Sequence, residues 1–505
     1  MQHWIARKNH IDADPELVSF FESPVGTAFL HRLVHGVHFV MTMSGAGSIR
    51  HVCQLLELTG LDQFVASSYG AQYDVSAKME QAIIKFDHSE RERLAASMPP
   101  KEITVCQDET FHPETCLVAI EPVSNFILLE KYADSRKASE WTKAMEEATY
   151  GLPVSIVQST SDEGKGILHH VKSDLGAQHS PDVFHVQHEI VKGTSAVLAS
   201  KKKKAEKRLE QAAEEVQHCI LEKEAYLQTQ HGRGRPPQFD KRIETSLQNQ
   251  EDAKQDLEFA ESHQQRMKEA IQNISKVYHP VDLETGKLRQ ADQVFESLNE
   301  CFESMESVAS EANLLDRSLK KIQKAKKVVV DMVAAVLFYH MTIQAKIEAL
   351  SLQLKVEQAI MDKLIPGLYL KRVSRQAKSA DDRRRLHDKS FDILQSLQGD
   401  NSPFIGLSSE ELELIEKVGK ECANLFQRSS SCVEGRNGQL SLRHHGLHRL
   451  SSRKLAALTA VHNYFIRRRD GTTPAERFFG TKPRELFEFL LSSLDLPGRP
   501  ARGRA

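Results

Sequence analysis

Hydrophobic residues recur every three or four positions through most of the first hundred residues, a spacing that predicts helices. The run FLHRLVHGVHFVM at 29–41 has this spacing, and the turn residues GAGS follow it at 45–48. Ser48 is the expected N-cap of the next helix, and TGLDQFVASS predicts the start of a third. Three short helices with a tight glycine turn fit a DNA-binding helix-turn-helix and fit a plain helical cap equally well.

The pattern changes between residues 102 and 189 to short β-rich runs separated by turn residues. EITVCQD, TCLVAIEPV and NFILLEKY predict an antiparallel meander, LPVSIVQSTSDEG a fourth strand, and PDVFHVQHE a fifth. Amphipathic segments at 135–151 and 164–176 predict helices between the later strands, and Gly151 is expected to end the first of these. This order of elements predicts an α/β sheet.

Helical spacing returns over residues 191–425. Apolar positions on both sides of the loop HGRGRPP, at 231–237, predict an antiparallel, coiled-coil-like helical hairpin, with Leu227 and Leu247 among its seam residues. The apolar run VVVDMVAAVLFY at 328–339 contains Asp331 and is short for a membrane span, so it predicts a buried helix and no membrane association.

The chain is therefore expected to contain several domains, because a single core seldom grows to this length. The predicted segments are a helical N-terminal domain at 1–99, a first α/β core part at 100–190, an α-helical insertion at 191–425, a last core part at 426–480 with one or two helices, and a basic, disordered C-terminal tail at 481–505.

Composition narrows the functional classes only a little. Lys and Arg total 67 against 69 Asp and Glu, and this balance neither predicts nor excludes nucleic acid, because local clustering of charge decides such binding. The seven cysteines are dispersed and form no CxxC pair, which argues for reduced thiols in the cytoplasm and against a cysteine-based zinc module.

Three acidic residues are candidates for metal-dependent phosphoryl chemistry, which needs hard oxygen ligands converging from separate elements. Asp108 is expected to close the first strand and Asp162 the fourth, so both carboxylates would emerge at one sheet edge if those strands are neighbours. Glu434 lies in a predicted helix among basic residues. Taken singly, each acid is as typical of a turn or of a first helical turn as of a metal site.

A strand-end Asp, a second Asp about fifty residues later and a late Glu resemble the DDE transposases of the RNase H-like superfamily. DVFH at 182–185 resembles the Cys/Asp-x-x-His signature of the hAT- and Mutator-like group, which also carries a large helical insertion. AVHNYFIRRRDGTTPAERFFG at 460–480 is similar to the closing segment of bacterial insertion-sequence transposases.

The resemblance implies an RNase H-like core and metal-dependent cleavage and strand transfer of DNA at the ends of a mobile element. By this resemblance Asp108, Asp162 and Glu434 are the catalytic residues and hold two Mg²⁺ or Mn²⁺ ions, with Glu189 and Glu421 as competing third acids. The implied partners are double-stranded transposon-end and target DNA and further copies of the chain, and the implied location is the nucleoid in the cytoplasm.

Other residues are expected to support this chemistry. Asp182 and His185 are interpreted as structural residues on the fifth strand. The basic residues expected to contact DNA phosphates are Lys201, Lys202, Lys203, Lys204, Arg233, Arg235, Arg436, Arg443, Arg467, Arg468 and Arg469. Two alternatives stay open: an RNase H-like nuclease without strand transfer, and an inactive helical DNA-binding or scaffold protein derived from a transposase.

Overall fold

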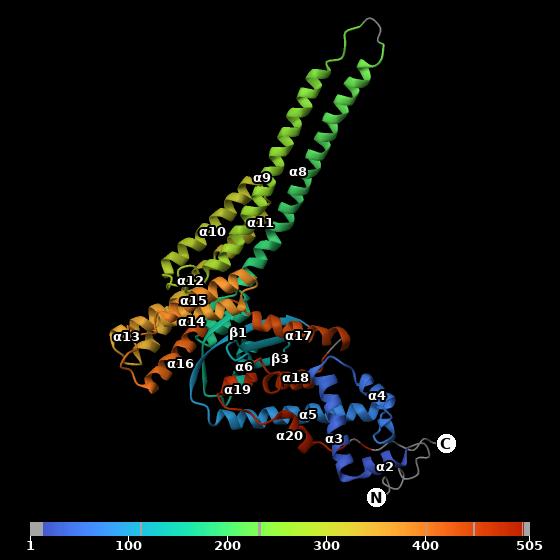
Figure 1. Cartoon of the computed structure of the whole chain (residues 1–505), viewed down its shortest axis with the longest axis vertical. Helices are drawn as coiled ribbons and strands as arrows, with labels where there is room; N and C mark the ends of the chain where they lie inside the picture. The colour runs from blue at the N-terminus through green and yellow to red at the C-terminus, as the bar shows by residue number, and fades with distance from the viewer. Residues whose placement is uncertain are drawn as a thin grey trace. The chain divides into compact units, whose positions relative to one another are not determined.

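The computed structural model describes residues 14–111, 114–230, 234–399, 401–447, 450–496 and 498, in which helices and one five-stranded sheet make a mixed α/β structure. The chain divides into two compact units (Figure 1). Unit 1 comprises Met1–His179 and Ser430–Ala505, and unit 2 comprises Ser180–Ser429. Unit 2 therefore lies, in sequence, between the two segments of unit 1.

The sheet of unit 1 has the strand order β3-β2-β1-β4-β5. The strands are β1 (Lys101–Phe111), β2 (Thr115–Glu121), β3 (Phe126–Tyr132), β4 (Val154–Ser161) and β5 (Gln178–Pro181). The first three form the expected antiparallel meander, and β4 pairs with β1 in parallel. The condition stated above for Asp108 and Asp162, that their strands be neighbours, is thus met.

One detail of β1 was predicted wrongly. Asp108 does not close the strand, because β1 continues to Phe111 and pairs with β2 over Cys106 to Phe111. The antiparallel partner satisfies the backbone of these polar residues, so the loss of apolar character does not end the strand.

Helices cover both faces of the sheet. On one face, α17 (Ser431–Leu447) and α18 (Ser452–Tyr464) pack against a core that includes Cys106, Val118 and Ile120. On the other, α6 (Ala138–Thr149) and α7 (Lys165–His169) pack against Leu117 and Ala119. Gly151, with φ of 74°, follows the end of α6 as expected.

The N-terminal segment is helical, with α2 (Pro15–Glu22), α3 (Pro24–His38), α4 (Ile49–Leu58) and α5 (Tyr69–Ala95). Ser48 caps α4 as predicted, its Oγ accepting a hydrogen bond from the backbone N–H of His51. The third helix does not begin in TGLDQFVASS, where residues 61–63 form only one 3-10 turn and Ser68 caps α5. Ser68 is the last residue of this run, and its hydroxyl caps the long helix, so that helix begins only after the run ends.

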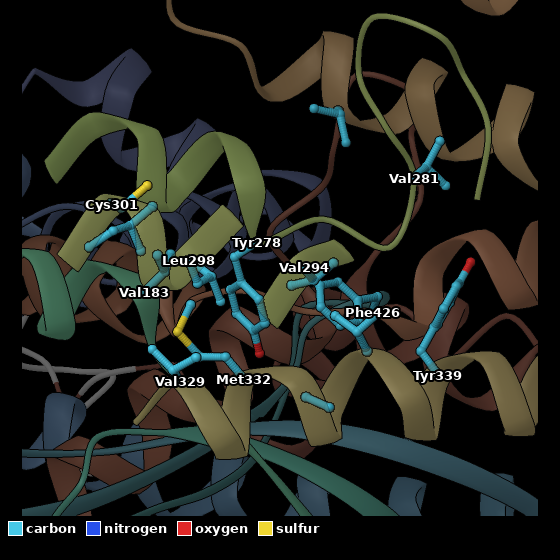
Figure 2. Packing of buried hydrophobic residues seen from close by; sticks show 14 of the residues in the cluster. Val183, Tyr278, Val281, Val294, Leu298, Cys301, Val329, Met332, Tyr339 and Phe426 are labelled. Carbon is cyan, nitrogen blue, oxygen red and sulfur yellow. The ribbon is translucent and has the colours of Figure 1, made fainter. Parts of the chain in front are cut away.

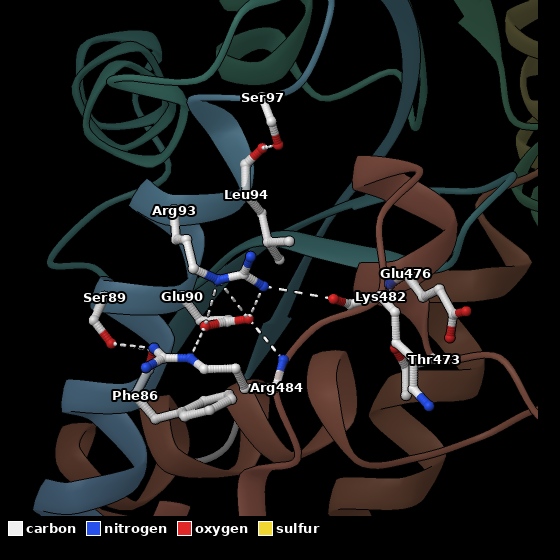
Figure 3. Close-up of polar contacts among 10 residues, drawn as sticks. All are labelled: Phe86, Ser89, Glu90, Arg93, Leu94, Ser97, Thr473, Glu476, Lys482 and Arg484. Atoms are coloured by element: carbon white, nitrogen blue, oxygen red, sulfur yellow. Dashed lines mark hydrogen bonds and ion pairs between the residues drawn. The ribbon is translucent and has the colours of Figure 1, made fainter.

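The C-terminal segment contains more structure than predicted. In the part of it that the structure describes, four helices follow residue 430, the last two being α19 (Pro474–Phe479) and α20 (Leu486–Ser493). Residues 486–493 are therefore not a disordered tail, because Leu486 and Leu490 are buried in the core formed with α5. Glu90 of α5 accepts hydrogen bonds from Arg93 and from the backbone and guanidinium of Arg484 (Figure 3). The contacts with Arg484 join the N-terminal and C-terminal segments of unit 1.

Apart from the end of β5 and one isolated bridge, the regular elements in the described residues of unit 2 are helices. Its predicted hairpin is confirmed: α8 (Val183–Leu227) and α9 (Phe239–Val277) pack along one another. Residues 231–233 of the loop expected between them lie outside the described residues. The remaining helices are α10 (Ala291–Glu311), α11 (Asp316–Lys326), α12 (Val329–Glu348), α13 (Leu354–Ala359), α14 (Ile365–Gln376), α15 (Ala380–Gln395) and α16 (Ser409–Leu425).

The half of the hairpin next to residues 228–238 buries fewer apolar side chains between its two helices than predicted. Leu227 and Leu247 are exposed, and the buried residues there are small or polar, including Cys219, Ser246 and Ala253. Ion pairs such as Lys223 with Asp240 link the two helices instead. Figure 1 shows α10 and α11 beside the other half of the hairpin, which buries large side chains such as Leu198 and Met267.

The expected fifth strand at 181–189 is wrong, since β5 ends at Pro181 and α8 begins at Val183. Asp182 caps α8, because its Oδ1 accepts from the backbone N–H of Phe184 at 2.7 Å and of His185 at 3.4 Å. Val183, Val186 and Ile190 are buried at helical spacing, which the alternating letters of DVFHVQH conceal.

The core of unit 2 is built around two buried aromatic residues, Tyr278 and Phe426, whose ring centroids lie 5.3 Å apart (Figure 2). Residues 316–348 are long and apolar enough to cross a membrane by length and composition. Within them, however, α12 buries Met332, Val336 and Tyr339 in this core, which agrees with the predicted buried helix.

Candidate active site

The candidate site lies at the edge of the sheet where β1 extends beyond the end of β4. The parallel pairing ends at Cys106 and Thr160, and β4 itself ends at Ser161. Asp108 follows Cys106 by two residues, and Asp162 follows Thr160 by two. Because neighbouring strands lie about 4.8 Å apart, the backbones of these two residues leave the pairing side by side.

Asp108 and Glu109 rise from opposite faces of the sheet, as successive strand residues do. Asp108 is opposite Val118, which packs under α17, whereas Glu109 is opposite Leu117, which packs under α6. Both side chains are half-buried. The Oδ1 atom of Asp108 accepts a hydrogen bond from the backbone N–H of Glu109 at 2.8 Å.

The connection from β4 to α7 holds the second acid. Asp162 Oδ1 accepts from the backbone N–H of Gly164 at 3.0 Å, and a Cβ at Gly164 would lie only 2.9 Å from that oxygen. A glycine at this position therefore lets the chain turn tightly around the carboxylate. The turn fixes Asp162 at the end of the strand and ahead of the helix, as predicted.

The sequence interpretation missed Glu163 and His179 at the same edge. His179 is a fully buried residue of β5, its Nε2 lies 3.1 Å from Ser161 Oγ, and its Nδ1 lies 3.9 Å from Glu163 Oε1. The only sequence signal was the adjacency of Glu163 to Asp162, since nothing local indicates that His179 lies on the strand beside β4.

Electrostatics show that this edge concentrates negative charge. Burial raises the pKa of Glu109, and the nearby charge of Asp162 raises it further. Trp141 Nε1 donates to Glu109 at 3.1 Å and Arg136 Nη1 at 3.3 Å, which partly offsets both effects. Acids that repel one another at a half-buried edge are the kind of group that a cation would stabilise.

The third acid, Glu434, is in the first turn of α17, as predicted. This helix is held over the sheet by Val433, which packs beside Cys106, and by Arg436, which donates to both carboxylate oxygens of Glu130 on β3 at 2.8 and 2.7 Å. Burial alone would raise the pKa of Glu130, but the charge and hydrogen bonds of Arg436 bring it below the ordinary value.

The direction of Glu434 follows from this anchoring. Each residue advances about 100° around a helix, so Arg436 and Glu434 lie on opposite flanks of Val433, about 160° apart. Arg436 reaches toward β3, at one side of the sheet. Glu434 therefore lies on the flank of α17 away from the one that reaches β3.

The competing acids Glu189 and Glu421 belong to unit 2, on α8 and α16. Glu189 lies 3.2 Å from the ammonium group of Lys192 and 3.4 Å from that of Lys321, and Glu421 is exposed. Asp182 and His185 are also in unit 2, where the carboxylate of Asp182 caps α8.

Two of the arginines that were predicted to contact DNA bind other groups of the protein instead. Arg436 is only 6% exposed and pairs with Glu130, and buried Arg443 donates to the backbone carbonyls of Thr42 and Met43. Their sequence neighbourhood gave no sign of these distant partners. Neither guanidinium is offered to a phosphate, so we do not retain them as DNA contacts.

The other predicted basic residues are placed differently. Lys202 pairs with Glu206 and Glu261, and exposed Arg467 pairs with Glu485. Exposed basic residues that form no ion pair within the described part of the chain are Lys203, Lys204, Arg235, Arg468 and Arg469, and half-buried Lys201 also forms none there. Arg233 lies outside the described residues.

The donors at this edge fit a hard divalent cation, since Mg²⁺ and Mn²⁺ prefer carboxylate oxygens. Asp108 and Asp162 come from a strand and from the loop after its parallel neighbour, so the fold and not the local sequence brings these two carboxylates to one edge.

Comparison with known proteins assigns no activity. Residues 360–505 match a family model described as a family of unknown function (DUF6399), which covers less than half of the chain. No curated protein and no solved structure matches this chain.

Proposed function

We propose that the chain is a DDE transposase whose unit 1 is an RNase H-like core and whose unit 2 is a helical insertion. The observation that carries this proposal is the parallel pairing of β1 with β4, which brings Asp108 and Asp162 to one edge. The position of Glu434 on α17, on the flank away from Arg436, supports the proposal. The resemblance described above requires these three acids to share one cleft.

In the proposed mechanism the three carboxylates hold two divalent ions beside a DNA phosphodiester. Bound Mg²⁺ or Mn²⁺ would lower the pKa of the attacking water or 3′-hydroxyl and stabilise the leaving oxygen. The chain's own contribution is positional: β1 and β4 fix two carboxylates on paired strands, and the Arg436–Glu130 pair holds the helix of the third. The proposed setting is the nucleoid, with several copies of the chain on the two transposon ends.

The test measures cleavage of a plasmid that carries the gene with its own flanking DNA, in Mg²⁺ and in Mn²⁺. We expect Asp108→Asn, Asp162→Asn and Glu434→Gln to lose at least about 100-fold in cleavage, as is typical when a metal ligand is removed. Glu189→Gln and Glu421→Gln are matched controls and should cleave normally. Calorimetric Mn²⁺ binding to each variant provides a readout that does not depend on activity.

The outcomes separate the alternatives. Cleavage without joining of the freed 3′ end to target DNA would favour a nuclease. A wild-type chain that neither cleaves nor binds Mn²⁺ would favour the inactive DNA-binding or scaffold protein. A normal Glu434→Gln with an inactive Glu421→Gln would overturn the assignment of the third acid.

A further inference from the structure

A groove about midway along the α8/α9 hairpin combines basic side chains with an exposed aromatic ring. It lies wholly within unit 2 and has a volume of about 360 Å³. Two helices form its walls, and residues 312 and 313, after α10, form a third. Its lining residues are Leu198, Lys201, Lys204, Ala205, Arg208, Asp256, Phe259, Ala260, His263, Glu311, Ala312 and Asn313.

The lining follows helical periodicity on both walls. Lys201, Lys204 and Arg208 are spaced three and four residues apart and form one stripe of α8. Asp256, Phe259 and His263 have the same spacing on α9. An ion pair between Arg208 and Asp256 and another between Lys202 and Glu261 set the register of the two helices.

The groove retains positive charge after its internal pairs are counted. Asp256 is paired with Arg208, and Glu311 lies 2.6 Å from Arg266, which is part of the hydrogen bonding that lowers the pKa of Glu311 to about 2. Among the described residues, Lys201 and Lys204 have no carboxylate within ion-pairing distance. Two ammonium groups are therefore available to an anion.

Phe259 is 64% exposed in the middle of this charged lining. An aromatic ring left in water gains nothing for the fold, whereas a base that stacks on it buries both faces in contact. The stripe from Lys201 to Arg208 spans seven residues, about 10 Å of helix, which matches two or three nucleotides at about 3.4 Å each.

We propose that this groove binds single-stranded nucleic acid, with Phe259 stacking on a base and Lys201 and Lys204 neutralising adjacent phosphates. A duplex hides the faces of its bases and is wider than a groove between two packed helices, so the strand must be unpaired here. The proposal rests on the proposed function for its context, because strand cleavage at DNA ends leaves single-stranded segments. It does not depend on the acidic edge of unit 1.

The test uses the full chain in EDTA and measures fluorescence anisotropy with a labelled ten-nucleotide oligothymidylate and with a labelled duplex. We expect Phe259→Ala to weaken single-strand binding about tenfold and to leave duplex binding nearly unchanged. Phe259→Trp should retain the affinity, since a larger ring also stacks. Phe391→Ala, which removes another exposed aromatic residue of unit 2, is the matched control.

Salt dependence tests the lysines. Lys201→Ala combined with Lys204→Ala should reduce the slope of log affinity against log salt by about 1.4, because each single-strand phosphate contact contributes about 0.7. Lys203→Ala is the control, since Lys203 is not among the lining residues and lies about 100° from Lys204 and about 160° from Lys201 around α8. It should leave the slope unchanged.

Three results would overturn the proposal: wild-type single-strand affinity in Phe259→Ala, an equal loss of duplex and single-strand binding, or displacement of the oligonucleotide by polyglutamate with the same dependence on Phe259. The last would make the groove a site for acidic polypeptides. Omitting divalent metal separates this result from that of the cleavage assay, so either proposal can fail without the other.

Discussion

At the scale of single residues, the most consequential contact is the ion pair between Arg436 and Glu130. Both side chains are buried, and Thr459 also donates to Glu130, so the pair fixes α17 over the sheet without help from solvent. Removing one partner would leave an uncompensated buried charge, which costs far more than the pair itself contributes.

We predict that Arg436→Ala lowers the free energy of unfolding by about 3–5 kcal/mol, measured by urea denaturation. The double variant Arg436→Met with Glu130→Leu should recover most of this loss, because no charge then remains buried. A double variant as unstable as the single one would show that packing, and not charge, holds α17.

Glu90 makes the stability of unit 1 depend on pH. Burial tends to raise its pKa, but hydrogen bonds and charge from Arg93 and Arg484 outweigh burial and lower it from 4.5. A folded pKa below the unfolded one stabilises the protein at pH values above about 4.5, and this contribution is lost as the pH falls through the folded pKa.

Glu90→Gln should therefore destabilise the chain at neutral pH by about 1–2 kcal/mol, a reduced figure because both arginines are nearly half exposed. It should also flatten the fall in stability between about pH 5 and pH 3. Glu92→Gln, an exposed change on the same helix, is the control for thermal unfolding across this range. An unchanged acid limb in Glu90→Gln would contradict the assignment.

At the scale of elements, the sequence predicted most helices and strands and misplaced several of their ends. Helical spacing identified the α8/α9 hairpin, and β-rich runs identified β1 to β4. The end of β1 depended on hydrogen bonds to β2, and the start of α8 on the side chain of Asp182. Pairing partners and caps of this kind are not visible in hydrophobic periodicity.

The cap supplies a direct test of the corrected assignment. Asp182→Ala should lower the free energy of unfolding by about 1 kcal/mol, since it removes the acceptor for the first N–H groups of α8, whereas Asp182→Asn should retain most of the cap. Mn²⁺ binding per folded molecule should be unchanged in both. Selective loss of metal binding would show that Asp182 is a metal ligand and not a structural residue.

His185 should matter less, because it is a third exposed and its Nε2 lies 4.0 Å from Asp182. We still expect His185→Ala to lose stability and activity together while metal affinity is kept. The hairpin tip stays a prediction too: Arg235→Ala with Arg233→Ala should lower the salt slope of DNA binding.

At the scale of the whole molecule, the chain forms two compact units, each with its own buried aromatic residues. Phe426 is buried in unit 2, and Phe126 is buried in unit 1, where it stacks on Phe478 with ring centroids 4.5 Å apart. Separate cores of this size usually unfold as separate cooperative units.

Differential scanning calorimetry should accordingly show two transitions. Phe426→Ala should lower the midpoint of one and Phe126→Ala that of the other, each by the several degrees that about 3–5 kcal/mol produces in a core of this size. A single transition lowered by either variant would show that the two units unfold together.

For the candidate site, the sequence suggested three acidic residues but gave no sign of several neighbouring residues. Asp108, Asp162 and Glu434 were chosen by spacing and resemblance, and the fold places all three in unit 1 although Glu434 follows 250 residues of unit 2. Glu163, His179 and the partners of Arg436 and Arg443 escaped notice, because those contacts join residues that nothing in the local sequence connects.

The length of the hairpin makes it a lever. Helix α8 has 45 residues, about 68 Å at 1.5 Å per residue, so a tilt of about 5° at its base displaces its tip by about 6 Å. The groove lysines and Arg208 lie about 27–38 Å along the same helix and would move by about half of that distance. Whatever binds at the tip is consequently carried through about twice the arc of what binds in the groove.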